Sequence, residues 1–247
     1  MNPIYTTGAP DIGDASSAVS NAFRALAGWA GFNSFEQVMR EFDRTKVYLA
    51  GGVLRDSFRS GFRVPKDFDF FLGHDDVDAF VKRLAEMGRI EIGPFGSPRW
   101  FPAGHDEIYA DVILIEHFYN GLWRCRDIID VLNQFDFTAN AIALDLRERA
   151  LFDPQNGIRD AKAGTMRAVR FDYPDEPLPS DARLSRLGIL WTRLMHYAKA
   201  LDLEIEPVTA KWLHDNSRFG QQEGAFAETF FEPKAAMIDW KRNSANG

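Results

Sequence analysis

Two aspartates, Asp67 and Asp69, are separated by a single residue in the run K-D-F-D-F-F at positions 66–71. Side chains on a β-strand alternate between its faces, so both carboxylates point to one side while Phe68 and Phe70 point into a core. Like charges a few ångström apart raise each other's pKa or recruit a counter-ion. Proteins commonly hold Mg²⁺ with one or two carboxylates and the phosphates of a substrate. The pair therefore predicts a magnesium site, and the alternative is a solvated strand edge.

A glycine pair lies just upstream and offers a place for phosphate. The apolar run 47–50 predicts a strand that Gly51 and Gly52 end, and residues 53–59 have helical spacing. The start of a helix has free N–H groups and the positive end of the helix dipole, which attract phosphate. A phosphate site and a metal site on neighbouring elements indicate metal-assisted phosphoryl or nucleotidyl transfer.

The joint pattern, G-G-V-L-R-D-S-F-R-S-G at 51–61 followed by P-K-D-F-D at 65–69, resembles the head domain of class II tRNA nucleotidyltransferases (CCA-adding enzymes) and bacterial poly(A) polymerases. The resemblance implies an α+β, polymerase-β-like nucleotidyltransferase head, with a mixed or antiparallel sheet flanked by helices, followed by a small all-helical neck. It implies that Asp67 and Asp69 hold two Mg²⁺ ions, with Mn²⁺ as an alternative. It also implies that a nucleoside triphosphate, ATP or CTP, is held by Gly51, Gly52, Arg55 and Lys66.

The strong strand pattern at 108–115, I-Y-A-D-V-I-L-I, carries one acidic residue, Asp111. In polymerase-β-like folds a third carboxylate from a neighbouring strand often joins the D-x-D pair, and the resemblance suggests Asp111 for that place. The alternative is an aspartate at a strand edge that caps a turn.

The run F-D-F-T-A-N-A-I-A at 135–143 resembles a second family motif, R-R-D-F-T-x-N-A-x-A. Asp136 and Asn140 are polar residues in an apolar stretch, which predicts a buried hydrogen-bond network. The resemblance implies that both lie beside the sugar and phosphates of the nucleotide. The paired arginines of the family are replaced by Gln134 and Phe135, so ordinary handling of the triphosphate is an open question.

Two later segments also match the family in part. The run 151–169 resembles D-P-x-x-G-x-x-D-x-x-x-G-x-x-R, in which most positions are turn residues and Arg167 is a candidate phosphate contact. A long helix is expected at 181–201 with Ser180 as its cap. In the family this helix begins with E-D-x-x-R, which reads the incoming base. Here the glutamate is absent, and the candidate nucleotide contacts are Asp181, Arg183 and Arg186.

The whole chain has 247 residues and a hydrophobic content of 45%, which is enough to bury a sizeable core. We expect an N-terminal extension at 1–45 with an irregular start to about residue 20 and two helices, at about 18–30 and 34–42. The head is expected at 46–170 and the neck at 180–247. No secretory signal and no membrane span is visible, and a single cysteine excludes an internal disulfide, so a cytoplasmic protein is expected.

The leading function is a metal-dependent transfer of a nucleoside monophosphate to an acceptor hydroxyl, with an RNA or tRNA 3′ end as the acceptor that the resemblance implies. A net charge of −7 argues against binding long nucleic acid over the whole surface but allows a local basic groove. One alternative is a toxin-like or regulatory enzyme that modifies a protein or small molecule. Another is a nucleotide-binding module without catalysis. The body and tail of the full family enzymes are absent here, so a homo-oligomer or a partner chain could replace them.

Overall fold

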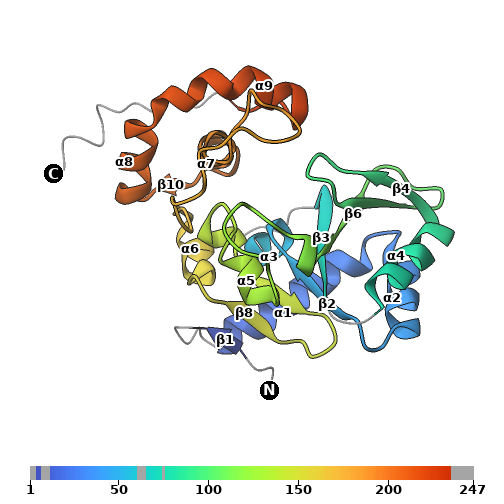
Figure 1. Ribbon diagram of the computed structural model, residues 1–247. Helices are drawn as coiled ribbons and strands as arrows, with labels where there is room; N and C mark the ends of the chain where they lie inside the picture. Colours follow the sequence, from blue (N-terminus) through green and yellow to red (C-terminus); the bar gives the residue numbers. More distant parts are fainter. Residues whose placement is uncertain (1–3, 7–11, 60–64, 74–75, 235–247) are drawn as a thin grey trace.

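A mixed β-sheet forms the centre of the protein in the computed structural model, which describes residues 4–6, 12–59, 65–73 and 76–234 (Figure 1). The strand order is β1 (Ile4–Thr6), β8 (Leu151–Asp153), β7 (Ala143–Asp145), β2 (Lys46–Ala50), β3 (Asp67–Gly73), β6 (Tyr109–Leu114), β5 (Pro98–Pro102) and β4 (Gly88–Ile92). The pairs β3–β6 and β1–β8 are parallel, and the other neighbours are antiparallel. The sheet confirms the predicted α+β class.

Helices cover both faces of the sheet, as the alternating pattern of β3 requires. One face packs against α1 (Ile12–Ala27), α2 (Phe32–Glu41) and α4 (Val77–Glu86). On that face Phe68 and Phe70 are fully buried, and their rings stack on Trp29 and Phe35 with centroids 4.9 and 4.1 Å apart. Burying each such ring contributes about 1.5–3 kcal/mol, so this face fixes the register of β3. The next residue, Phe71, packs on the other face, near α5 (Ile128–Leu132).

Short elements join these layers. They are α3 (Gly52–Ser57), α6 (Gly157–Ala163), β9 (Thr165–Met166) and the 3₁₀ turns at Ile115–His117 and Thr138–Asn140. The strand, glycine turn, helix and strand predicted for 47–72 are thus present. The helix ends at Ser57, two residues before the end of the 53–59 range that the spacing predicts.

The C-terminal part forms a group of helices beside the sheet, drawn in orange and red in Figure 1. It contains α7 (Arg186–Leu201), α8 (Pro207–Asp215), a 3₁₀ turn (Ser217–Gln222) and α9 (Glu223–Thr229). A two-residue strand, β10 (Glu204–Ile205), pairs with β9 and links this group to the rest of the chain. The helical character predicted for this part is confirmed, with β10 as an addition. None of the described helices combines the length and apolar character that a bilayer-spanning segment needs.

The first residues of two helices differ from expectation. Residues 12–20, expected to be irregular, belong to α1, because Ala15, Ala18 and Val19 are buried on its inner side. The other residues before 12 lie outside the description except for β1. The long helix expected from Asp181 with Ser180 as its cap begins instead at Arg186, and Ser185 is its cap, accepting a hydrogen bond from the Gly188 N–H at 3.1 Å.

Candidate active site

The acidic residues predicted to bind metal come together where β3 and β6 begin. In the parallel ladder Asp69 lies opposite Asp111, and Asp67 lies opposite Tyr109. Since residues two apart on a strand share a face, the side chains of Asp67, Asp69 and Asp111 all lie on the same side of the sheet. The structure therefore brings together the carboxylates that the sequence separates by more than forty positions, while their metal-binding role stays a prediction.

These carboxylates stand close enough to affect one another's charge. Burial raises the pKa of Asp69 well above its usual range, and the charges of Asp67 and Asp111 add to this effect. Burial and then the charge of Asp111 likewise raise the pKa of Asp67, against the opposing effects of Tyr109, Arg99 and Lys66. A raised carboxyl pKa means that the negative charges are undercompensated in the protein alone. Such a site gains free energy by binding a cation.

Arg99, which the sequence analysis did not single out, is the direct partner of the third carboxylate. It lies opposite Asp111 in the β5–β6 pair, and its Nε and Nη2 donate to the two carboxylate oxygens at 2.9 and 3.2 Å. Its guanidinium carbon lies 4.1 Å from the ring centroid of Tyr109, whose hydroxyl donates to Asp67 at 3.3 Å. The sequence alone could not reveal that Arg99 lies beside Asp111, because this depends on the register of β5 against β6.

The carboxylate oxygens of this site are suitable ligands for a hard divalent cation, with the remaining ligands supplied by a substrate. Among the residues that the structure describes, no three histidine, cysteine or acidic side chains are grouped as a ready metal cage. Asp67 and Asp69 alone match the usual Mg²⁺ arrangement of one or two carboxylates plus phosphate oxygens and water. We therefore assign the metal to this pair as a proposal, with Asp111 engaged by Arg99.

The glycine turn lies directly against this pair. Gly51 has φ +77° and ψ −137°, a conformation that side-chain-bearing residues rarely adopt. A Cβ at Gly51 would lie 2.8 Å from Oδ2 of Asp69, and Ala50 pairs with Asp69 in the β2–β3 ladder. Glycine is thus required at position 51 both for the turn and for the close approach of backbone to carboxylate.

The substitution Gly51→Ala is expected to destabilise the protein by about 1–3 kcal/mol, because the backbone conformation is strained and the added methyl group displaces the Asp69 carboxylate. Denaturant unfolding measures this change. Gly104→Ala is the matched control, since Gly104 also has positive φ, +78°, but a Cβ there would have no neighbour within 4 Å. Equal losses of stability in the two variants would contradict the role of the Asp69 contact.

Arg55 and Asn140, both predicted to contact nucleotide, bond to each other. Arg55 is only 6% exposed; its Nη1 donates to Oδ1 of Asn140 at 2.7 Å and its Nε to Asp56 at 2.9 Å. A Cβ at Gly52 would lie 3.4 Å from the Arg55 guanidinium. The predicted buried network is therefore present. It joins the glycine turn to the second motif, and it holds Arg55 beneath the turn.

Asp136 is held by a residue of the C-terminal helices. Arg193, on α7, donates from Nε to Oδ2 of Asp136 at 2.9 Å, and its Nη2 lies 2.8 Å from the same oxygen. The charges of both residues also act on Asp69: Arg193 lowers its pKa, and Asp136 raises it. The signal for Arg193 was available in the sequence, since it follows Arg186 by two helical turns.

The remaining candidates are more dispersed. Lys66 is exposed and its charge acts on Asp67. Arg167 forms an ion pair with the buried Asp160 at 3.1 Å, so its present contact is within the fold. Arg186 lies over the ring of Tyr119, with 5.5 Å between the guanidinium carbon and the ring centroid.

Asp181 and Arg183 lie in the turn before α7 and pair with each other. Arg183 donates to Asp181 at 2.7 Å and to Glu228 at 2.7 Å. The structure does not place either residue with the carboxylates: the groups that perturb the pKa of Asp181 are Arg183, first, and Thr229. Their nucleotide-binding role stays a prediction.

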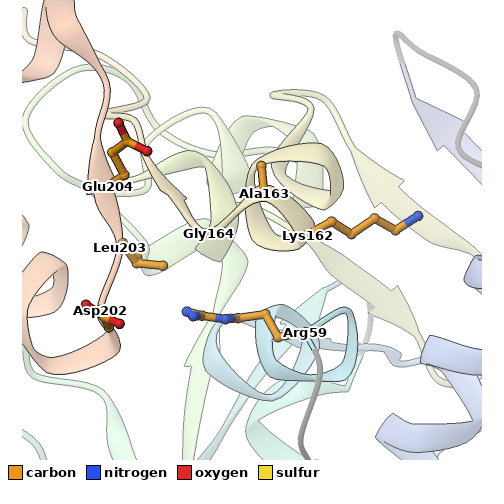
Figure 2. A pocket seen from close by; sticks show the side chains of 7 residues that line it. All are labelled: Arg59, Lys162, Ala163, Gly164, Asp202, Leu203 and Glu204. Atoms are coloured by element: carbon orange, nitrogen blue, oxygen red, sulfur yellow. The ribbon is translucent and has the colours of Figure 1, made fainter.

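A polar hollow of about 480 Å³ lies elsewhere, between the end of α3, the end of α6 and residues 202–204 (Figure 2). In Figure 2 Arg59 extends toward Asp202 and Leu203, and it donates to the Leu201 carbonyl at 3.1 Å. None of the predicted site residues lines this hollow, so it is separate from the candidate active site.

Comparison with known proteins supports the resemblance seen in the motifs. No family model matches the chain. The Multifunctional CCA protein of Xanthomonas axonopodis pv. citri (strain 306) is 26% identical over 205 residues, covering 81% of this chain and 47% of that protein. The protein of the same name from Teredinibacter turnerae (strain ATCC 39867 / T7901) is 26% identical over 209 residues, covering 78% and 45%. The chain thus spans about half the length of the curated relatives it matches.

Solved structures share the fold at lower identity. A CCA-adding enzyme in complex with CTP superposes with a TM-score of 0.62 at 20% identity, covering 88% of this chain and 51% of that one. A Thermotoga maritima CCA-adding enzyme in complex with tRNA gives 0.60 at 20% identity, covering 87% and 51%. The predicted nucleotidyltransferase fold and the resemblance to CCA-adding enzymes are therefore confirmed.

Proposed function

We propose that the protein is a metal-dependent nucleotidyltransferase that transfers a nucleoside monophosphate from a triphosphate to an acceptor hydroxyl and releases pyrophosphate. The observation that carries the proposal is the approach of the Gly51 turn to Asp69, which lies next to Asp67 and opposite Asp111 of the neighbouring strand β6. This arrangement places a glycine turn beside an undercompensated pair of carboxylates. Similarity to CCA-adding enzymes in sequence and fold supports it.

The reaction requires that the acceptor hydroxyl lose its proton to solvent and its oxygen bond to the α-phosphorus, while the bond from the α-phosphorus to the bridging oxygen breaks and pyrophosphate leaves. Asp67 and Asp69, joined by Asp111, would hold the divalent cations, two Mg²⁺ ions or Mn²⁺. When bound, these ions would lower the pKa of the attacking hydroxyl and neutralise the charge on the pyrophosphate. The glycine turn, kept in place by the Arg55–Asn140 bond, would position the phosphates.

We propose ATP or CTP as donor and an RNA 3′ end, in particular that of tRNA, as acceptor. The similar structures support this choice, since they are CCA-adding enzymes in complex with CTP, ATP and tRNA. Base selection would fall to α7, whose Arg193 reaches the site, while Asp181 and Arg183 pair away from it. A cytoplasmic location and a homo-oligomer or partner chain stay predictions.

The acceptor is identified by incubating the protein with each of the four α-labelled nucleoside triphosphates, Mg²⁺ or Mn²⁺, and total RNA, trimmed tRNA or total protein. The expected result is label on RNA, from ATP or CTP, that is lost in the Asp67→Ala/Asp69→Ala variant. Label on protein would contradict the proposed RNA acceptor but would still agree with nucleotidyl transfer. Label on nothing, from a folded protein, would contradict the proposed function.

A further inference from the structure

The third carboxylate of the site is occupied by an arginine from the chain itself. Arg99 engages both oxygens of Asp111 in a fork-to-fork pair, and neither side chain is more than a quarter exposed. Two parallel charge-assisted hydrogen bonds are stronger and more directional than a single contact. Both carboxylate oxygens of Asp111 already accept a hydrogen bond from Arg99, so a cation bound there would have to share them with a positive charge, although the register places Asp111 beside Asp69.

Neighbouring residues contact the Arg99 side chain but leave it partly exposed. Its guanidinium carbon lies over the ring of Tyr109, 4.1 Å from the centroid, and a Cβ at Gly93, in the β4–β5 turn, would lie 3.7 Å from both Arg99 and Asp111. Stacking on an aromatic ring leaves the edge of the guanidinium, which carries its hydrogen-bond donors, available for a second planar or tetrahedral anion. A guanidinium pairs with phosphate in the same two-pronged geometry as with carboxylate.

The pair has a consequence for the charge of the site. With Asp111 paired to Arg99, Asp67 and Asp69 are left to attract the first cation. A second cation near Asp111 would compete with a permanent positive charge. That competition ends only if another anion draws the guanidinium away.

We propose that Arg99 is an exchangeable counter-ion: it holds Asp111 until the triphosphate arrives, then pairs with a phosphate oxygen and releases Asp111 to a second divalent cation. This inference rests on the proposed function, because it assigns a triphosphate to the same site. It makes the second cation dependent on the substrate and makes Arg99 a positioning residue for Asp111. No bond is formed or broken in the exchange; one ion pair replaces another.

The test counts Mn²⁺ ions bound to the intact protein, from the electron paramagnetic resonance signal of free Mn²⁺, without nucleotide and with a non-hydrolysable triphosphate analogue. Wild type is expected to bind one ion alone and two with the analogue, after correction for Mn²⁺ bound by the analogue in solution. Arg99→Gln is expected to bind the second ion without the analogue, at least about tenfold more tightly than wild type does. Its affinity for the analogue should fall by a similar factor.

Arg89→Gln is the matched control, since Arg89 is on the same hairpin, stacks on Phe101 and pairs with Asp106. It should bind Mn²⁺ as wild type does. Asp111→Asn provides a second variant that should stay at one ion even with the analogue. Equal Mn²⁺ binding by wild type and Arg99→Gln would overturn the exchange while leaving the proposed function intact. No Mn²⁺ binding by any variant, with or without the analogue, would overturn both.

Discussion

Asp69→Asn is expected to reduce nucleotide transfer by about a thousandfold or more, because a preorganised charge that holds a catalytic cation contributes most where charge develops in the transition state. The amide keeps the shape of the side chain, so the contact with the Gly51 turn remains. Initial rates of label transfer to RNA at saturating Mg²⁺ measure the loss. Asp106→Asn, at an exposed aspartate between β5 and β6, should keep the wild-type rate.

The same substitution should leave the metal-free protein at least as stable as wild type. Burial and the neighbouring carboxylates raise the pKa of Asp69, so the folded state binds more protons than the unfolded state above the usual aspartate range. Stability then falls as pH rises through that window, because ionising the buried Asp69 carboxyl costs free energy in the folded state. Denaturant unfolding in EDTA checks this. A large loss of stability in Asp69→Asn would show that the carboxylate is structural and would contradict the account.

Arg193→Met is expected to lower the free energy of unfolding by about 3 kcal/mol, because it leaves the poorly exposed Asp136 without its partner beside another acidic group. Methionine keeps most of the apolar stem and removes only the guanidinium, whose carbon lies 5.1 Å from the ring centroid of Tyr197, so the loss reports on charge more than on packing. Transfer should fall as well, since Arg193 joins α7 to the site. Denaturant unfolding and transfer rates measure the two effects.

A double variant separates the pair from its surroundings. Adding Asp136→Asn to Arg193→Met should recover part of the stability, because no unpaired charge then remains. Arg183→Met is the control, since Arg183 pairs with Asp181 and Glu228 at the surface, where ion pairs contribute little to stability. An equally small loss of stability in Arg193→Met and Arg183→Met would contradict the role of the Arg193–Asp136 pair in joining α7 to the head.

The local pattern was enough to predict the strand, turn, helix and strand of the head, because side-chain alternation and glycine requirements act over a few residues. Phe68 and Phe70 could enter the core only if Asp67 and Asp69 faced the other way, and they do. Asp111 was placed beside them through the resemblance, and the parallel register confirms that position. The fold class followed from the same motifs.

What the sequence did not reveal depends on contacts between distant segments. Arg99 meets Asp111 because β5 folds back on β6 in one register, and Arg193 meets Asp136 because α7 crosses to the head. The start of α7 was misplaced because Ser180 and Ser185 are both good caps. The Pro177–Ser185 bridge and the Leu178–Leu184 hydrogen bond, which keep 178–184 out of the helix, are tertiary features.

The central claim is that this site moves a nucleoside monophosphate, and the most direct test follows both halves of the donor. ATP and CTP are supplied with trimmed tRNA and Mg²⁺, each carrying label either on the α- or on the γ-phosphate. The account predicts α-label in RNA and γ-label in pyrophosphate in equal amounts, both lost in Asp67→Ala/Asp69→Ala. Release of γ-label as inorganic phosphate without α-label in an acceptor, or transfer that persists in the double variant, would contradict it.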